Sequence, residues 1–401
     1  MTSLPSDQDT SGRTVGAEEL ALLGEVIASG VLNSTRGTQT ARFEKAFGAL
    51  LGHGRSAIAC NSGSAAVHTA VAALDLEPGD EVIVSPLTDV GGVAPVLWQG
   101  CIPVFADVDP YTLNVTADSV AARITPLTRA VIVTHLFGNP ADVTGILEVA
   151  RRHNLYVLED CAQAFGAETA GQPVGTLGDL ACFSLQQTKH ITTGEGGLVC
   201  GADAQLVARA HQFVNKARIY SDPEPEHHFL AMNYRMTELQ GAVGVAQLEK
   251  LPEVVRARRE GAARLVAALD GVAGVSVPGP LPGAQHSYWK IPLQVDPAVL
   301  DGGGAAFGAG LAERGVGSAP GYQRPAWTWS VIAHQRTFGT SRYPFTLARP
   351  EALDYSPQRY PGTLAGRASV VVLPWNERYT TSDIDRIATA IADVAATLRR
   401  Q

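Results

Sequence analysis

The chain has 401 residues, of which 45% are hydrophobic and 17% charged, a balance expected of a globular protein large enough for two domains. Its formal net charge of -8 argues against a surface that binds nucleic acid or an anionic membrane. No stretch approaches the ~20 apolar residues that a membrane helix needs, and the polar N-terminus lacks the pattern of an export signal. We therefore expect a cytoplasmic protein with neither nucleic acid nor membrane as a partner.

The five cysteines form no C-x-x-C pair, and most of them sit in apolar stretches. Such cysteines are expected as reduced, buried thiols rather than as disulfides or zinc ligands. We therefore predict no metal site. The cysteines are Cys60, Cys101, Cys161, Cys182 and Cys200.

The first predicted element is a helix over residues 18–28, followed by Gly30 as a C-cap. Its spacing places three apolar side chains on one face: Leu20, Leu23 and Ile27. The next segment, Asn33–Gly37, has the composition of a turn, in which glycine allows a positive φ.

A strand over residues 55–60 is expected to lead into a helix over 65–74 that begins at Ser62-Gly63-Ser64. A helix start carries unpaired N–H groups and partial positive charge, and Gly63 allows an anion to approach the backbone closely. The segment therefore predicts a phosphate site. The plain alternative is an ordinary N-cap formed by Ser62 or Ser64.

Short apolar strands then alternate with helices, which indicates a mostly parallel sheet. The expected strands are 82–84, 102–105, 130–134 and 156–160, with a helix over 146–153 before the last of them. That last strand ends at Asp160, where the ligands of open α/β sheets collect. A carboxylate there could pair with a ring nitrogen. For His135 and His190 we expect ordinary structural roles.

Residues 180–197 form an apolar strand that runs into Lys189 and then into a glycine-rich turn. Lysine is scarce, with only five in the chain, so Lys189 is a candidate nucleophile that could form a Schiff base once desolvation lowers its pKa. The alternative is a solvated loop lysine. A lysine, an acid for a ring nitrogen and a phosphate site are together what pyridoxal phosphate (PLP) requires.

An antiparallel strand over 197–200 and a helix over 203–213 are expected next. Thr237 and Gln240 have capping-box spacing for a helix over 238–248, and the character of the chain changes beyond Pro252. There we expect a helix over 254–269, turns at 278–283, a strand over 288–295, a glycine-rich stretch at 302–310 and a last helix. That helix follows a predicted Ser382/Asp385 capping box and carries an apolar stripe: Ile384, Ile387, Ile391, Val394 and Leu398.

This order of motifs resembles the DegT/DnrJ/StrS family of PLP-dependent aminotransferases, which aminate keto-sugars and keto-cyclitols. The motifs are GTQTARFEKAF, SGSAAV, LEPGDEVIVSP, PVFADVDP, HLFGNPAD, EDCAQAFGAE, SLQQTKHITTGEGG and NYRMTELQGAVGVAQLEKL. The resemblance implies an α/β chain with the type I aminotransferase fold: a large domain with a mostly parallel seven-stranded sheet flanked by helices, and a smaller α+β C-terminal domain. We divide the chain into an N-terminal helix and arm (1–37), a PLP-binding domain (38–252) and a small domain (253–401).

The resemblance also implies roles for individual residues. Lys189 would form the Schiff base and shuttle a proton, and Asp160 would bond the ring nitrogen. Gln163 would bond the 3-hydroxyl of the cofactor. Phosphate ligands would be Gly63, Ser64, Ser184 and, from the other subunit, Asn233, which makes the expected assembly a homodimer with shared active sites.

For the substrate, Asn33–Gly37 is expected near the site, and Arg235 could equally bind a substrate carboxylate or form a structural salt bridge. Asp89 departs from the family, because most members place there an aromatic residue that stacks on the cofactor. Either a neighbouring backbone segment covers that ring face, or Asp89 marks a subgroup with a polar pocket. Lys189 is retained, unlike in relatives with histidine at this position, which are dehydratases. The irregular segment 315–361 either lines the substrate entrance or is an insertion.

The predicted function is transfer of an amino group from glutamine or glutamate to a keto-sugar or keto-cyclitol of secondary metabolism, such as an aminoglycoside-type antibiotic. The alternatives are a dehydratase or aromatising synthase of the same family, and a regulator that binds PLP without turnover. A nicotinamide dehydrogenase is disfavoured because no G-x-G-x-x-G follows a first strand.

Overall fold

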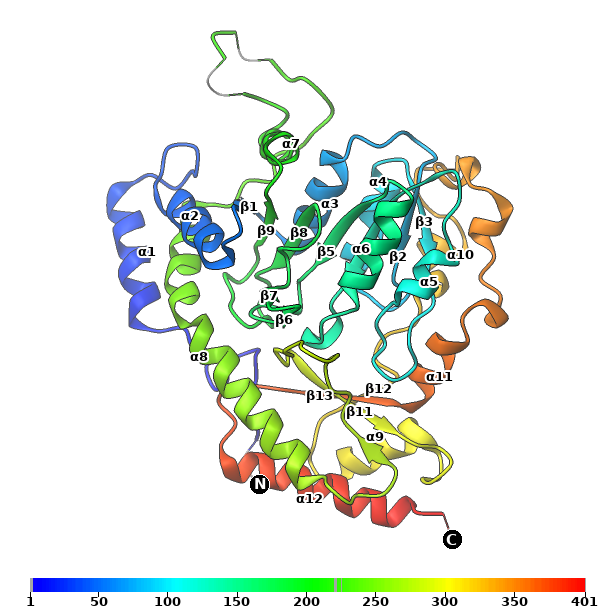
Figure 1. Cartoon of the computed structure of the whole chain (residues 1–401). Coiled ribbons are helices and arrows are strands. Elements are labelled where there is room, and N and C mark those ends of the chain that lie inside the picture. Colours follow the sequence, from blue (N-terminus) through cyan, green and yellow to red (C-terminus); the bar gives the residue numbers. More distant parts are fainter. Residues whose placement is uncertain (1–2, 220–221, 225, 401) are drawn as a thin grey trace.

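The computed structural model describes residues 3–219, 222–224 and 226–400. A seven-stranded sheet forms the upper part of the molecule in Figure 1 and a four-stranded sheet the lower part, with the long helix α8 running along both. The helices are α1 (Ala17–Ser29), α2 (Gln39–Leu51), α3 (Gly63–Ala73), α4 (Ala94–Trp98), α5 (Ala117–Ala121), α6 (Val143–Arg152), α7 (Ala204–Val214), α8 (Glu238–Ala268), α9 (Gly303–Glu313), α10 (Ser330–Ala333), α11 (Pro361–Ser369) and α12 (Thr381–Leu398).

The large sheet has the strand order β1-β9-β8-β5-β4-β2-β3. The neighbours from β8 to β3 pair in parallel, and β9 is antiparallel to both β8 and β1. The mostly parallel sheet and the antiparallel strand after the glycine turn are therefore confirmed. The bounds are β1 (Ser56–Cys60), β2 (Glu81–Val84), β3 (Ile102–Phe105), β4 (Thr128–Thr134), β5 (Tyr156–Asp160), β8 (Leu180–Ser184) and β9 (Gly197–Gly201).

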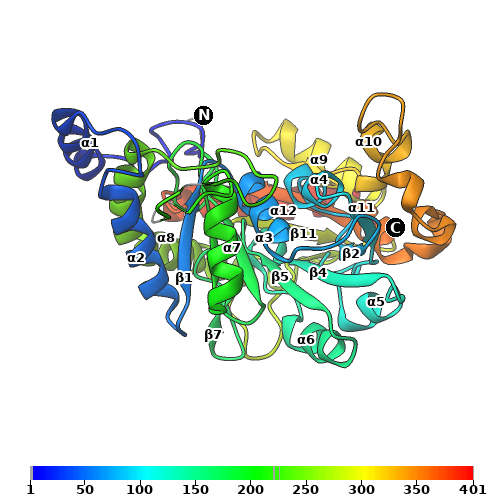
Figure 2. The same ribbon diagram turned by 90° about the horizontal axis from the view of Figure 1, so that it is seen from above.

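Both faces of this sheet are covered, which explains why its strands are short continuous apolar runs. In β8 the side chains alternate between two cores: Leu180 and Cys182 pack toward α3, whereas Ala181 and Phe183 pack toward α2 and α8. Toward the β3 edge, α5 and α6 cover the same face as α2 and α8. Figure 2, a view from above, shows α3 and α7 on one side of the strands and α6 on the other.

The four-stranded antiparallel sheet has the order β10-β11-β13-β12, and a separate hairpin pairs β6 with β7. The four-stranded sheet packs with α9, α12 and the second half of α8 around a core of its own. The predicted fold class, a large sheet domain with a smaller α+β part, is confirmed. The bounds are β6 (Glu168–Thr169), β7 (Gln172–Pro173), β10 (Val275–Ser276), β11 (Lys290–Val295), β12 (Ala319–Pro320) and β13 (Val370–Pro374).

The helix α8 differs from the prediction. It starts at the predicted Thr237/Gln240 capping box, but it runs on through Pro252 to Ala268 instead of ending at residue 248. A proline inside a helix costs about 3 kcal/mol. Here the helix buries apolar side chains before and after the proline, in two different cores, and this burial offsets the cost. The predicted domain boundary at residue 252 stays a prediction.

The last helix, α12, begins two residues earlier than predicted. Its capping box is formed by Thr380 and Asp383 rather than by Ser382 and Asp385, and Asp385 is paired with Arg264 at 2.7 Å. The predicted apolar stripe is confirmed, since Ile384, Ile387, Ile391 and Val394 are buried and Leu398 is half-buried against them.

Of the face of α1 predicted from Leu20, Leu23 and Ile27, only Leu23 is partly covered by the rest of the described chain. Leu20 is 72% exposed and Ile27 62%. The opposite face packs on α8, where Glu19 accepts a 2.8 Å hydrogen bond from Lys250. The helix ends at Gly30, with φ 69°, as predicted.

Among the described residues, no helix combines the length and the apolar character that crossing a membrane requires. The five cysteines are free and buried, as predicted.

Candidate active site

A cavity of about 360 Å³ lies where β5 and β8 end and α3 begins. Its size is in the range of small-molecule sites. Seven of the predicted site residues line it: Gly63, Ser64, Asp89, Asp160, Gln163, Ser184 and Lys189. Residues from four separate stretches of the chain are therefore brought together.

One end of the cavity is the N-terminus of α3. Ser62 is the N-cap, and its hydroxyl accepts the Ala65 N–H at 3.1 Å, so the ordinary capping role is present. A Cβ added at Gly63 would lie 2.7 Å from Cβ and 2.8 Å from Oγ of Ser184. Glycine is therefore required where the Ser184 hydroxyl meets the first turn of the helix. The first-turn N–H groups and this hydroxyl together offer the kind of donors that an anion site requires.

Lys189 projects into the cavity with its Nζ 4.2 Å from the ring centre of Trp289. The pKa of the Lys189 amine is lowered to about 8. Burial is the main cause and the charge of Lys290 adds to it, while the charges of Asp160 and Asp89 act in the opposite direction. The amine is thus closer to its nucleophilic neutral form than a surface lysine.

Asp160 is buried at the end of β5, where its Oδ1 accepts the Ala162 N–H at 3.1 Å. Burial raises the pKa of this carboxyl, while the Ala162 hydrogen bond and the charges of Lys189 and His135 lower it. A protonated ring nitrogen placed beside Asp160 would favour the ionised carboxylate.

Gln163 is held by two hydrogen bonds. Its Oε1 accepts the Phe137 N–H at 2.7 Å, and its Nε2 donates to the Tyr322 hydroxyl at 3.1 Å. Tyr322 and the neighbouring Gln323 also line the cavity. The sequence carried no signal for Tyr322, which lies at a glycine turn inside the irregular segment 315–361.

That segment therefore has two parts. Its start lines the cavity, and the rest forms short helical turns that cover the large sheet near β2 and β3. The Ala326 N–H donates to Pro86 O at 2.9 Å, the Trp327 ring packs against Phe105, and Arg349 pairs with Glu81 at 2.8 Å.

Asp89 is exposed on the cavity wall, at the start of the short turn Val90–Gly92. Its Oδ1 accepts the Gly91 N–H at 2.9 Å. The backbone of Gly91 and Gly92 lines the same wall. The backbone segment and the polar side chain of the two sequence alternatives therefore both line the cavity, and which of them faces the cofactor ring stays a prediction.

Asn233 and Arg235 do not line this cavity. Asn233 is exposed, and its Oδ1 accepts the Arg235 N–H at 3.3 Å. It lies at the base of a two-limbed extension, bridged at Asn215–Asn233 and Arg218–His227, that projects from the end of α7 (Figure 1). Arg235 lines a second cavity of about 590 Å³, together with part of the predicted turn, Ser34–Arg36.

The two histidines have structural partners, as predicted. The His190 ring lies 3.0 Å from Ser287 O. His135, Glu159 and Cys161 form the one group with metal-ligand spacing in the described part of the chain. The Glu159 oxygens, however, already accept the N–H groups of residues 175, 177 and 178, and His135 Nε2 lies 3.1 Å away. Hydrogen bonds therefore account for this group.

A model of the DegT/DnrJ/EryC1/StrS aminotransferase family matches residues 13–392. The GDP-perosamine synthase of Caulobacter vibrioides is 44% identical over 227 residues, which are 56% of this chain and 60% of that protein. The L-glutamine:2-deoxy-scyllo-inosose aminotransferase of Streptomyces kanamyceticus is 37% identical over 277 residues, 66% of this chain and 65% of that protein. The chain thus spans less than two thirds of either relative.

Two solved structures are similar over nearly the whole chain. The aminotransferase TlmJ from Streptoalloteichus hindustanus has a TM-score of 0.82 at 31% identity, and the match covers 96% of this chain and 98% of that one. The 3-amino-5-hydroxybenzoic acid (AHBA) synthase has a TM-score of 0.86 at 26% identity, with the same coverage.

Proposed function

Because this chain belongs to the DegT/DnrJ/EryC1/StrS aminotransferase family, we propose that it is a PLP-dependent aminotransferase with Lys189 as its cofactor-binding lysine. The amino donor is glutamine or glutamate, and the acceptor is a keto-sugar or a keto-cyclitol. The observation that carries the proposal is the convergence of Lys189, Asp160 and the α3 N-terminus in one cavity.

The residues present fit PLP. The first turn of α3, with Gly63, Ser64 and the Ser184 hydroxyl, would hold the phosphate, and Lys189 would hold the aldehyde carbon. Asp160 would hold the proton on the ring nitrogen, and Gln163 would bond the 3-hydroxyl. When bound, PLP supplies an electron sink for the bond that breaks at the substrate carbon. Once the substrate amine has displaced it from the aldehyde carbon, the Lys189 amine would be free to move a proton between the substrate carbon and the cofactor.

The wall that carries Asp89 would lie against one face of the ring. The backbone of Gly91 and Gly92 provides the contact that an aromatic side chain makes in other members, and the Asp89 carboxylate is left to bind a polar group of the substrate. Arg235 lines the second cavity, so any contact that it makes with a substrate would lie outside the Lys189 cavity of its own subunit.

The proposed assembly is a homodimer with shared active sites. Asn233 would reach the phosphate of the other subunit, since it lies outside the cavity of its own. The exposed apolar face of α1 and the projecting extension after α7, whose Leu230 is 93% exposed, support an interface with a second copy. Within each subunit we propose the division into residues 1–37, 38–252 and 253–401.

The relatives support both acceptor classes, because one is named for a nucleotide sugar and the other for a cyclitol. The name of the cyclitol enzyme supports glutamine as the donor. A role in secondary metabolism, including antibiotic biosynthesis, is part of the proposal. The free, buried cysteines support a cytoplasmic location.

The test is to load the protein with PLP, add glutamine or glutamate, and follow the cofactor absorbance. We expect the donor to convert the cofactor to its amino form. One of a panel of keto-sugars and keto-cyclitols should then restore the original absorbance of PLP. An aminotransferase consumes one donor molecule per molecule of product, whereas a dehydratase or an aromatising synthase does not. The aromatising synthase is tested because the fold also resembles that of the AHBA synthase. Bound PLP without any turnover would show a regulator.

A further inference from the structure

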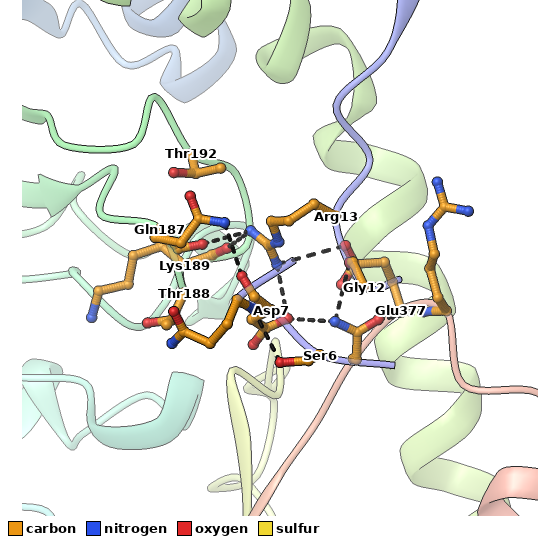
Figure 3. Close-up of polar contacts among 12 residues, drawn as sticks. Ser6, Asp7, Gly12, Arg13, Gln187, Thr188, Lys189, Thr192 and Glu377 are labelled. Carbon is orange, nitrogen blue, oxygen red and sulfur yellow. Dashed lines mark hydrogen bonds and ion pairs between the residues drawn. The ribbon is translucent and has the colours of Figure 1, made fainter. Parts of the chain in front are cut away.

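Three successive carbonyl oxygens of the loop that carries Lys189 are held by side chains from distant parts of the chain. Arg13 Nη1 donates to Gln187 O at 3.0 Å and to Lys189 O at 2.8 Å. Between them, Thr188 O accepts the Trp289 indole N–H at 2.7 Å. Figure 3 shows the Arg13 guanidinium facing the lysine loop while the Lys189 side chain points away from it. The Lys189 side chain lines the cavity.

Arg13 is itself fixed by a buried network. It is only 5% exposed, and its Nη2 donates to Asp7 Oδ1 at 2.9 Å. Asn376 also donates to Asp7 Oδ1, and Gln187 Nε2 donates to Asp7 O at 3.0 Å. The N-terminal segment 7–13 is therefore bound both to the lysine loop and to the segment after β13.

The network continues to α8 and balances in charge. Arg258, fully buried, pairs with Glu377 at 2.7 Å and with Asp7 at 3.4 Å. Two arginines thus face two carboxylates, Asp7 and Glu377, which is the condition under which buried charges are tolerated. Arg258 Nη1 also donates to Trp289 O at 3.1 Å, so the residue that holds Thr188 is anchored to the same network.

We propose that Arg13 is a positioning residue for Lys189: its guanidinium, held by Asp7, bridges the carbonyls on either side of Thr188 and thereby aims the lysine amine into the cavity. The inference rests on the proposed function, because it assigns Arg13 a part in presenting the amine to the cofactor. Arg13 uses one guanidinium nitrogen for the two carbonyls and the other for Asp7, and a lysine ammonium, with its donors on a single nitrogen, does not reproduce this geometry. The N-terminal segment thus takes part in the site although it contributes no group to the cavity.

The experiment measures how fast the cofactor-free protein captures PLP. In this step the Lys189 amine attacks the aldehyde carbon, the carbonyl oxygen leaves as one water molecule, and a C=N bond replaces the C=O bond. Capture is followed by absorbance at saturating PLP, so the phosphate site, which Arg13 does not touch, does not limit the rate. Arg13→Ala is expected to lower the rate by on the order of tenfold or more.

The pH dependence of capture gives a readout that a merely structural role would not move. If the loop is released, the amine is less desolvated, and the midpoint of the rate against pH rises. Arg13→Lys restores the positive charge but not the planar pair of guanidinium nitrogens. Its capture of PLP is expected to remain slow, with the same raised midpoint.

Arg55→Ala is the matched control. Arg55 also binds carbonyls of a loop, Gly178 O at 2.8 Å and Asp179 O at 3.3 Å. This loop precedes β8, whereas the loop that carries Lys189 follows β8. Arg55→Ala is expected to lose thermal stability while keeping the capture rate within about twofold. The inference is overturned if Arg13→Ala has the same capture rate and the same pH midpoint as Arg55→Ala. If Arg13→Ala does not fold, the same comparison is made with Arg13→Lys. Failure of the wild-type protein to capture PLP would instead overturn the proposed function.

Discussion

The Lys189 amine lies 4.2 Å from the ring centre of Trp289. The indole N–H of the same tryptophan donates a hydrogen bond to Thr188 O, the carbonyl of the residue before Lys189. The electron-rich ring face attracts a cation, so Trp289 favours the protonated amine, while burial favours the neutral one. One side chain therefore fixes both the backbone of the lysine loop and the resting place of the amine. Lys290 lies over the same ring, at 4.9 Å.

The pKa of Lys189 predicts how capture of PLP depends on pH. A lysine attacks an aldehyde only when it is neutral, and burial lowers this pKa from 10.5 to about 8. The capture rate of the cofactor-free protein should therefore rise with pH through a midpoint near 8 and level off above it. Stopped-flow absorbance over pH 6 to 10 measures this. A midpoint near 10.5 would show that the amine is solvated.

Asp160→Asn should keep bound PLP and lose most of the rate. Asparagine still accepts the Ala162 N–H, but it carries no charge to hold the proton on the ring nitrogen. We expect the donor half-reaction to slow by about 100-fold or more. Asp179→Asn is the control, because Asp179 also accepts a backbone N–H, that of Val157 at 2.7 Å, outside the cavity. Equal half-reaction rates for the two variants would refute the role of Asp160.

The strands, the capping box at Thr237 and the position of Asp160 and Lys189 at the ends of neighbouring strands could be predicted because each depends on local pattern. Apolar runs specify buried strands, and the end of a parallel strand is a fixed place in the sheet. The resemblance supplied roles that the pattern could not.

The contribution of Arg13 could not be predicted, because it depends on contacts across 174 and 176 residues to backbone carbonyls, which carry no side-chain signature. The continuation of α8 through Pro252 could not be predicted for a related reason. Burial in two cores decides whether a helix continues through a proline, and a single stretch of sequence does not contain that information. Tyr322 was missed because its segment has no periodicity.

Charges on the exposed face of α1 should prevent association. Leu20→Glu with Ile27→Glu places two carboxylates on a surface that the proposed dimer buries, and neither side chain is packed within the described chain. We expect a monomer by analytical ultracentrifugation, with unchanged far-UV circular dichroism. Leu281→Glu, at a leucine that is 42% exposed in a turn before β11, should leave the mass unchanged. An unaltered mass in the double variant would place the interface elsewhere.

Complementation tests whether Asn233 serves the other subunit. Loss of its hydrogen bond to the phosphate, worth about 1.5–3 kcal/mol, should loosen PLP by roughly 10- to 150-fold. Mixed Lys189→Ala and Asn233→Ala subunits should form heterodimers with one site carrying both defects and one carrying none. After random reassortment half of the dimers are mixed, so activity should return to about a quarter of wild type at a PLP concentration where Asn233→Ala alone is nearly inactive. If mixing adds nothing to the two parents, Asn233 acts within its own subunit.

The identity of the lysine that binds the cofactor is the most direct test of the account. The PLP-loaded protein is reduced with borohydride, digested, and mapped by mass spectrometry, with Lys189→Ala as the control. We predict that the phosphopyridoxyl group is found on Lys189 and that the control carries none while keeping its fold. Its presence on Lys290, the other lysine beside Trp289, or the absence of any adduct in the wild-type protein, would contradict the account.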